Sequence, residues 1–163
     1  MLKVKHSTMI FLSGLVWLAV GCWLLPLGLN FVVSTLLDKN VNMSRPVLDG
    51  LAPYFRGVES AAMIWIAICL MIGCLKGRFI FAKTVNRGVQ RISKLPNPAP
   101  LSQIYPLSYY ILLGSMVFLG FLVRYAPLDV RGGVDVIIGT ALINGAMLYF
   151  RQAWAARQKP AYL

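Results

Sequence analysis

Four long apolar runs, separated by shorter polar stretches, dominate the sequence. They lie at about residues 9–36, 57–75, 106–123 and 134–150. Each approaches the roughly 20 residues that an α-helix needs to cross a hydrocarbon core about 30 Å thick. The pattern therefore predicts an all-α fold: an integral membrane four-helix bundle that forms a single transmembrane domain over residues 1–163.

The first run extends to residue 37 and is longer than one membrane crossing needs. It contains Pro26, which we expect to kink or end the helix because proline lacks an amide hydrogen. Gly14, Gly21 and Gly28 recur at every seventh position. One side of this helix therefore carries a thin strip, which in lipid allows another helix to approach closely.

Residues 76–104 form the one long stretch that is strongly basic and contains no acid. Within it, apolar residues recur at helical spacing, and cations follow the same spacing two residues later: Lys83, Arg87, Arg91 and Lys94. This pattern predicts a basic amphipathic helix that lies on a leaflet and binds anionic lipid headgroups. The alternative is a solvated continuation of the second span.

The distribution of charge predicts the orientation in the membrane. Most of the 16 lysines and arginines lie near the N-terminus, in residues 76–104 or in the C-terminal tail, whereas all five acids lie in the other loops or beside them. By the positive-inside rule, both termini and the basic loop are cytoplasmic in a multi-pass protein of the bacterial inner membrane. The net charge of +11 thus reflects membrane flanks, and we expect no nucleic-acid partner.

The second and fourth runs begin with similar residues. Arg56-Gly57-Val58-Glu59 matches Arg131-Gly132-Gly133-Val134-Asp135, with one extra glycine in the second segment. The match suggests a duplication, in which two parallel two-helix repeats are joined by the basic amphipathic helix. Such repeats would be related by an axis along the membrane normal.

Charged residues near these two helix starts are the first candidate site. We expect them to gather at the outer face as the mouth of a vestibule for ions or a small charged solute: Arg56, Glu59, Arg124, Arg131 and Asp135. The alternative is that Glu59 and Asp135 only stabilise helix N-termini and pair with arginines three or four residues earlier.

Thr140 and Asn144 are polar positions within the fourth run. They could line a polar path, or they could form hydrogen bonds between helices, which is the commoner role of such side chains.

A short motif resembles a known family. Gly120-x-x-x-Arg124-Tyr125, followed by Gly139-Thr140-x-x-x-Asn144, is similar to the opening signature of small dual-topology fluoride channels. The resemblance implies an anion channel. It covers about 25 residues, which end this chain but begin the proteins of that family, and the family's paired phenylalanines and serine/threonine box have no counterpart here. As a whole, the chain resembles small four-span bacterial inner-membrane proteins.

Catalytic and metal-binding patterns are missing from the sequence. His6 is the only histidine, and the three cysteines form no C-x-x-C pair. We therefore expect no metal, no cofactor and no enzymatic activity. The expected function is a small ion- or solute-transport or channel-type unit that acts as a homo-oligomer, because four helices seldom enclose a pore. The alternatives are an accessory or assembly subunit of a larger membrane complex and a membrane-embedded lipid-processing enzyme.

Overall fold

The computed structural model describes residues 3–4, 6–37, 44–93, 99–100, 114, 118 and 120–158. Helices dominate these residues. They are α1 (His6–Leu37), α2 (Pro46–Leu51), the 3-10 helix η1 (Ala52–Tyr54), α3 (Val58–Lys76), the π-helical turn η2 (Gly77–Phe81), α4 (Ala82–Ser93) and α6 (Leu128–Gln158). Two short strands, β1 (Lys3–Val4) and β2 (Ala99–Pro100), pair antiparallel.

Three of the helices are long and apolar enough to cross a membrane: α1, the continuous helix Val58–Ile92, and α6. The predicted all-α fold is therefore confirmed, and these three helices are candidate membrane spans. The predicted span at residues 106–123 lies mostly outside the described residues, of which 114, 118 and 120–123 are helical. The four-helix bundle and the repeats remain predictions.

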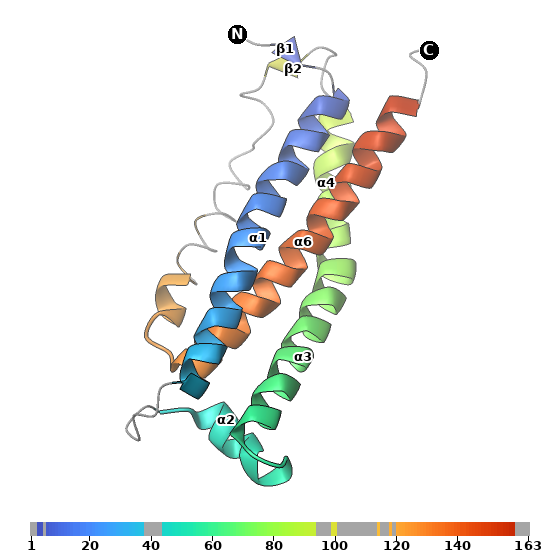
Figure 1. Ribbon diagram of the computed structural model, residues 1–163. Coiled ribbons are helices and arrows are strands. Elements are labelled where there is room, and N and C mark those ends of the chain that lie inside the picture. The colour runs from blue at the N-terminus through green and yellow to red at the C-terminus, as the bar shows by residue number, and fades with distance from the viewer. Residues whose placement is uncertain are drawn as a thin grey trace.

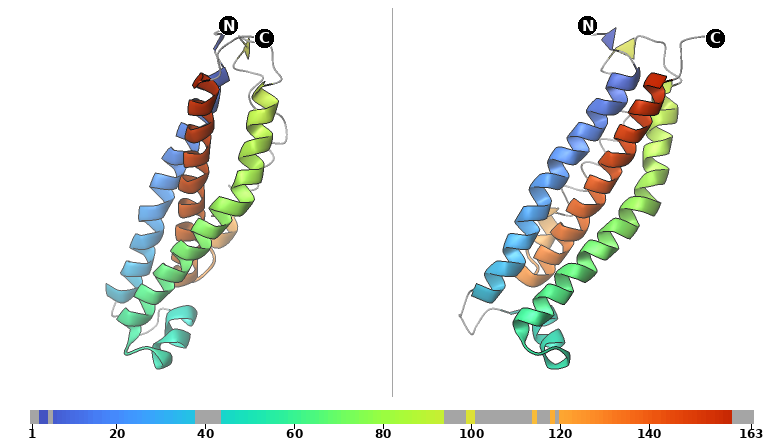
Figure 2. Two further views of the ribbon diagram at one scale, coloured as in Figure 1. Left: turned by 90° about the vertical axis from the view of Figure 1, so that its right-hand side faces the viewer. Right: turned by 45° about the vertical axis from the view of Figure 1, so that its right-hand side comes forward.

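The long helices run side by side. α1 is antiparallel to α6, whereas α3 and α4 follow α6 in the same direction (Figures 1 and 2). The start of α1 and the ends of α4 and α6 lie at one end of the bundle, which we call the terminal end. The end of α1 and the starts of α3 and α6 lie at the other, which we call the α2 end (Figure 1).

Glycines bring α1 and α6 into backbone contact, and this contact surface is called the α1–α6 seam below. A Cβ atom added at Gly21 would lie 2.9 Å from the carbonyl oxygen of Gly139, and one at Gly28 would lie 2.8 Å from that of Gly132. Real Cβ atoms do not approach other atoms this closely, so only glycine fits. The predicted role of the glycine strip, close approach of another helix, is thus confirmed, and the other helix is α6.

Helix α1 does not end at Pro26 but continues to Leu37. Pro26 lies on the exposed side of the helix. Gly21 and Gly28, before and after it, both pack on α6. Tertiary packing thus holds the helix together on both sides of the proline, and the prediction of a helix end at this residue is wrong.

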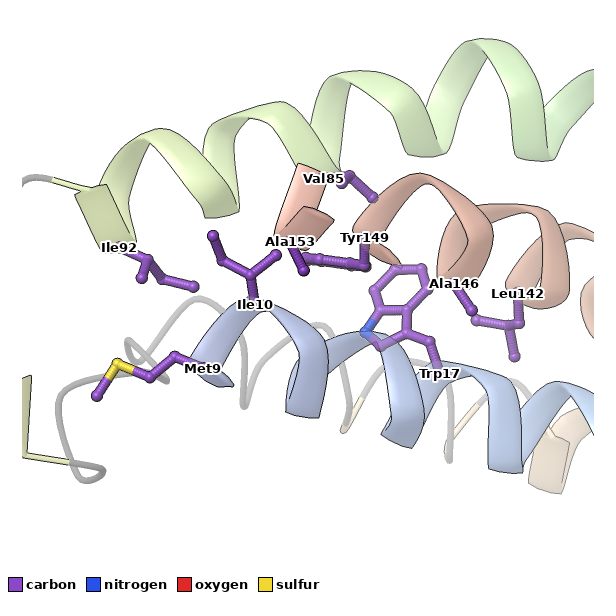
Figure 3. Packing of buried hydrophobic residues seen from close by; sticks show 9 residues of the cluster. All are labelled: Met9, Ile10, Trp17, Val85, Ile92, Leu142, Ala146, Tyr149 and Ala153. Carbon is purple, nitrogen blue, oxygen red and sulfur yellow. The ribbon is translucent and has the colours of Figure 1, made fainter. Parts of the chain in front are cut away.

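The basic stretch forms a helix as predicted, but this helix does not lie separately on a leaflet. α3, η2 and α4 are continuous over residues 58–93. Val85 and Ile92 are 0% and 4% exposed, and they pack in one cluster with residues of α1 and α6 (Figure 3). Gln152 of α6 also donates a hydrogen bond to Asn86. Since protein already buries the apolar face of α4, the leaflet-bound orientation is wrong and the helix is a continuation of the second span.

An aromatic layer crosses the three long helices near the middle of α1. The rings of Trp17 and Phe81 meet edge to face, with centroids 4.9 Å apart. A Cβ atom at Gly145 would lie 3.2 Å from the Trp17 ring and 3.6 Å from Phe81. Residue 17 of α1, residue 81 of η2 and residue 145 of α6 therefore share one level, and this layer divides the bundle into two halves.

Candidate functional site

The five charges predicted to gather at one face occupy different environments. Arg56 and Glu59 are exposed at the α2 end, and Arg124 is exposed in the turn before α6. Arg131 is partly buried and Asp135 is buried, both on α6. Of the five, only Arg131 and Asp135 thus lie within the bundle, one helical turn apart.

Asp135 lies deeper in the bundle than Glu59. A Cβ atom at Gly133 would lie 2.7 Å from the ring of Trp65, so these two residues are level with each other. Trp65 comes six residues after Glu59, which is about 9 Å along a helix. The two acids that the sequence comparison aligned are therefore not equivalent: Glu59 lies in the first turn of α3, whereas Asp135 lies two turns into α6.

Asp135 lies at the α1–α6 seam and is only 9% exposed. A Cβ atom at Gly28 of α1 would lie 2.9 Å from the Cβ of Asp135. Its carboxylate forms no hydrogen bond or ion pair with another described residue. No described donor compensates the cost of placing this carboxylate between packed helices, and its oxygens retain some exposed surface.

Arg131 does not neutralise Asp135 in a direct ion pair. Its guanidinium carbon instead lies 4.3 Å from the centre of the Phe31 ring of α1. Such a cation–π contact contributes about 0.5–2 kcal/mol, more when water is excluded. Asp135 lies two turns into α6 rather than at its start. Arg131 nevertheless interacts electrostatically with it, so the predicted pairing with an arginine one turn earlier stays a prediction. For Glu59, a position in the first turn of α3 fits the helix-start role.

Asp129 is a buried carboxylate that the sequence analysis did not single out. It is 0% exposed. Its Oδ2 accepts hydrogen bonds from the backbone amides of Val47, at 2.8 Å, and Leu48, at 3.3 Å, while Oδ1 accepts one from Val130 at 2.8 Å. The Trp65 indole donates to the Asp129 carbonyl oxygen at 3.2 Å. Asp129 thus joins the starts of α2 and α6 and holds α3 beside them.

Only part of this role could be read from the sequence. An acid directly after Pro127-Leu128 is typical of the first turn of a helix, where it meets the positive end of the helix dipole. The amides of α2 that it binds are 82 and 81 positions away in the chain, and no local pattern indicates them.

Helix α2 closes this end of the bundle. Leu48 is 0% exposed and packs in a cluster with Val32 of α1 and Ala62 of α3. Arg45, just before α2, donates a hydrogen bond to the Thr35 carbonyl oxygen at 2.7 Å. That bond satisfies one of the carbonyl groups that the end of α1 leaves without a helical partner.

Thr140 and Asn144 lie between α6 and α3. The Asn144 side-chain amide donates to the Thr140 carbonyl oxygen at 3.0 Å and to the Cys74 Sγ of α3 at 3.6 Å. Thr140 is 7% exposed, and its hydroxyl has no hydrogen-bond partner among the described residues. Cβ atoms at Gly73 and Gly77 would lie within 3 Å of these two side chains. The arrangement is that of an interhelical contact.

The predicted headgroup-binding cations lie on the outer side of α4. Lys83, Arg87 and Arg91 are exposed, opposite the buried Val85 and Ile92. Lys94, the fourth predicted cation, lies outside the described residues.

In the part of the chain that the structure describes, no group of three or more His, Cys, Asp or Glu side chains could hold a metal ion. Cys22, Cys69 and Cys74 are free, and only Cys69 is buried. Comparisons with protein-family models, curated proteins and solved structures find no match to this chain.

Proposed function

We propose that the half of the bundle between the aromatic layer and the α2 end lies in the bilayer. In this half α1 contributes residues 18–37, the continuous helix of α3 and η2 contributes residues 58–80, and α6 contributes residues 128–144. At about 1.5 Å per residue these segments measure about 30 Å, 34 Å and 26 Å, which is close to a hydrocarbon core of about 30 Å.

The exposed cations of α4 support this placement. A bilayer shifted toward the terminal end would bury Lys83, Arg87 and Arg91 in lipid, at roughly 2.5–3.5 kcal/mol for each charge. Lys76 and Arg78, which are also exposed, lie just on the bilayer side of the aromatic layer. Their long side chains can reach the headgroups. With cations at this end, the positive-inside rule makes the terminal end, and so both chain termini, cytoplasmic in a bacterial inner membrane.

The sequence analysis expects Asp135 at the outer face, whereas this placement puts it in the membrane interior. The bilayer half of α6 is residues 128–144, and Asp135 is its eighth residue. It therefore lies close to the midplane. Ionisable side chains at this depth are costly, and those found there commonly serve ion or proton pathways.

On this basis the protein is a small, non-enzymatic transport unit of the cell membrane, in which Asp135 binds the transported ion. The observation that carries the proposal is a carboxylate 9% exposed, on the bilayer side of the aromatic layer, with no partner among the described residues. A bundle of so few helices seldom encloses a pore by itself, so the active form is a homo-oligomer.

Flux measurements in vesicles of phosphatidylethanolamine and phosphatidylglycerol test the proposal. Protons, potassium, chloride and fluoride should be tested in turn with the wild type, Asp135→Asn and Asp49→Asn. Asp49 is an exposed acid of α2 and provides the matched control. We expect one ion to be carried by the wild type and Asp49→Asn, and a flux equal to that of empty vesicles with Asp135→Asn. A wild-type protein that carries none of these ions would contradict the proposal.

An accessory or assembly subunit is the second candidate, and α4 is the observation that favours it. The continuous helix of residues 58–93 projects about 25 Å beyond α3, and the projection carries Lys83, Arg87 and Arg91 on its surface. This basic face suits anionic headgroups or an acidic partner subunit. The α1 glycine strip is not available for docking because α6 occupies it. Recovery of a stoichiometric partner from native membranes, lost on substitution of the three cations by glutamine, would favour this role.

A further inference from the structure

We infer that the ion bound at Asp135 is a proton, an inference that rests on the proposed transport function. Metal cations such as Ca²⁺ and Mg²⁺ require about six oxygen ligands. The α1 residue that packs on the Asp135 Cβ is Gly28, and the residues within a turn on α6 are 131–134 and 136–139, which are arginine, glycine, valine and isoleucine. None of these side chains supplies an oxygen ligand. A proton needs none besides the carboxylate itself.

The other buried carboxylate cannot complete a metal site either. The two oxygens of Asp129 already accept three backbone hydrogen bonds. Asp129 also lies almost two turns before Asp135, at the first turn of α6. Among the described residues, Asp135 is therefore a single carboxylate with no second acid to share a cation.

The charged groups around Asp135 are few. Helix α1 has no acid or base after His6, apart from the exposed thiol of Cys22. On α3, the charged residues Glu59 and Lys76 lie at opposite ends of the helix, and its thiols are Cys69 and Cys74. Arg131, one turn before Asp135 on α6, is thus the nearest charge in the described bundle.

These surroundings suit reversible protonation. A neutral carboxylic acid is far less costly to bury in an apolar seam than a carboxylate. When the proton leaves, the carboxylate lies one turn from the guanidinium of Arg131, and residues four apart on a helix lie about 6 Å from each other. The site can therefore hold both the protonated and the ionised form, as a proton carrier must.

Dicyclohexylcarbodiimide provides a direct test because it reacts with protonated carboxyl groups in apolar surroundings. The carboxyl oxygen bonds to the carbodiimide carbon while the carboxyl proton moves to a nitrogen, and the acyl group then migrates to that nitrogen. The product is a stable adduct of one whole reagent molecule. Mass spectrometry of the treated full-length protein in phosphatidylethanolamine and phosphatidylglycerol vesicles identifies the modified residue.

We expect a single adduct on Asp135, whose yield falls as the pH rises and which is absent from Asp135→Asn. Asp135→Glu should restore labelling, because it restores a carboxyl group at the same level. Asp129 should remain unlabelled because its oxygens are occupied, and a water-soluble carbodiimide should instead label the exposed Asp49 and Glu59. Proton flux should fall in proportion to the labelled fraction.

The outcomes separate the inference from the function on which it rests. Flux of another ion, with Asp135 unlabelled, would overturn the proton assignment and leave the transport function standing. Labelling of Asp135 in vesicles that pass no ion would support the protonated site and remove the transport function. Labelling of all acids in proportion to their exposure would overturn the inference.

Discussion

Asp129 and Asp135 are buried carboxylates on the same helix, and their surroundings differ. Asp129 accepts three backbone hydrogen bonds, two from the start of α2 and one from its own helix. Asp135 accepts none from the described residues and lies against a glycine of α1. A fully satisfied carboxylate at two helix starts stabilises the scaffold, whereas an unsatisfied one is available to bind something else. Hydrogen-bond partners, rather than burial alone, distinguish the two roles.

The comparison also predicts opposite consequences of substitution. Removal of the Asp129 carboxylate leaves three backbone donors without an acceptor. Replacement of the Asp135 carboxyl group leaves no described donor unpaired and takes an ionisable group out of the bundle. Stability and transport should therefore respond to different residues.

Asp129→Ala should produce the largest loss of stability. We expect the free energy of unfolding to fall by about 3 kcal/mol or more, because each buried donor left without an acceptor costs about 1–3 kcal/mol. Thermal unfolding in mild detergent measures the loss. The fluorescence of Trp65, whose indole donates to the Asp129 carbonyl oxygen, should change as α2 detaches. Asp49→Ala, at an exposed position of α2, is the control, and equal stability of the two variants would remove the scaffold role of Asp129.

Gly28→Ala should lower the stability by an intermediate amount and should also alter the surroundings of Asp135, because Gly28 packs against Asp135 at the α1–α6 seam. The new methyl group would lie 2.7 Å from the Val136 nitrogen and 2.9 Å from the Asp135 Cβ, so the helices must separate. Overpacking of this kind costs about 1–3 kcal/mol. Labelling of Asp135 by dicyclohexylcarbodiimide should change in the same variant.

The control for this substitution is Gly50→Ala, where the added Cβ meets nothing within 4 Å. We expect Gly50→Ala to leave both the unfolding temperature and the labelling unchanged. An unfolding temperature and a labelling yield that are also unchanged in Gly28→Ala would contradict the close packing of α1 against Asp135.

Replacement of Lys83, Arg87 and Arg91 by glutamine should have little effect on stability. These side chains are exposed, and surface substitutions usually change the free energy of unfolding by less than about 0.5 kcal/mol. The variant should instead bind phosphatidylglycerol vesicles or an acidic partner less tightly, while Asp135 remains labelled. In the wild type, a reporter fused after Ser93 should read cytoplasmic. A periplasmic signal would invert the orientation on which the membrane placement depends.

The sequence predicted the features that depend on local spacing. The second span, expected at residues 57–75, is Val58–Lys76 in the structure, because helix length and apolar periodicity are set by neighbouring residues. The close approach at Gly21 and Gly28 was also predicted, since a seven-residue spacing places both on one side of the helix.

The features that depend on distant contacts could not be predicted. Val85 and Ile92 form the same apolar face whether lipid or protein covers it, so the sequence could not exclude a leaflet-bound helix. Glu59 and Asp135 looked equivalent because their flanking residues match. The structure separates them because α6 already begins at Leu128, so only Asp135 lies two turns into its helix.

The most direct test of the account measures stability and proton flux on one preparation of Asp135→Asn. We predict an unfolding temperature equal to or above that of the wild type, because no described donor loses its acceptor and an ionisable group is replaced by a neutral one, together with a proton flux equal to that of empty vesicles. A destabilised variant that still conducts protons would contradict the account, because Asp135 would then be part of the scaffold, as Asp129 is.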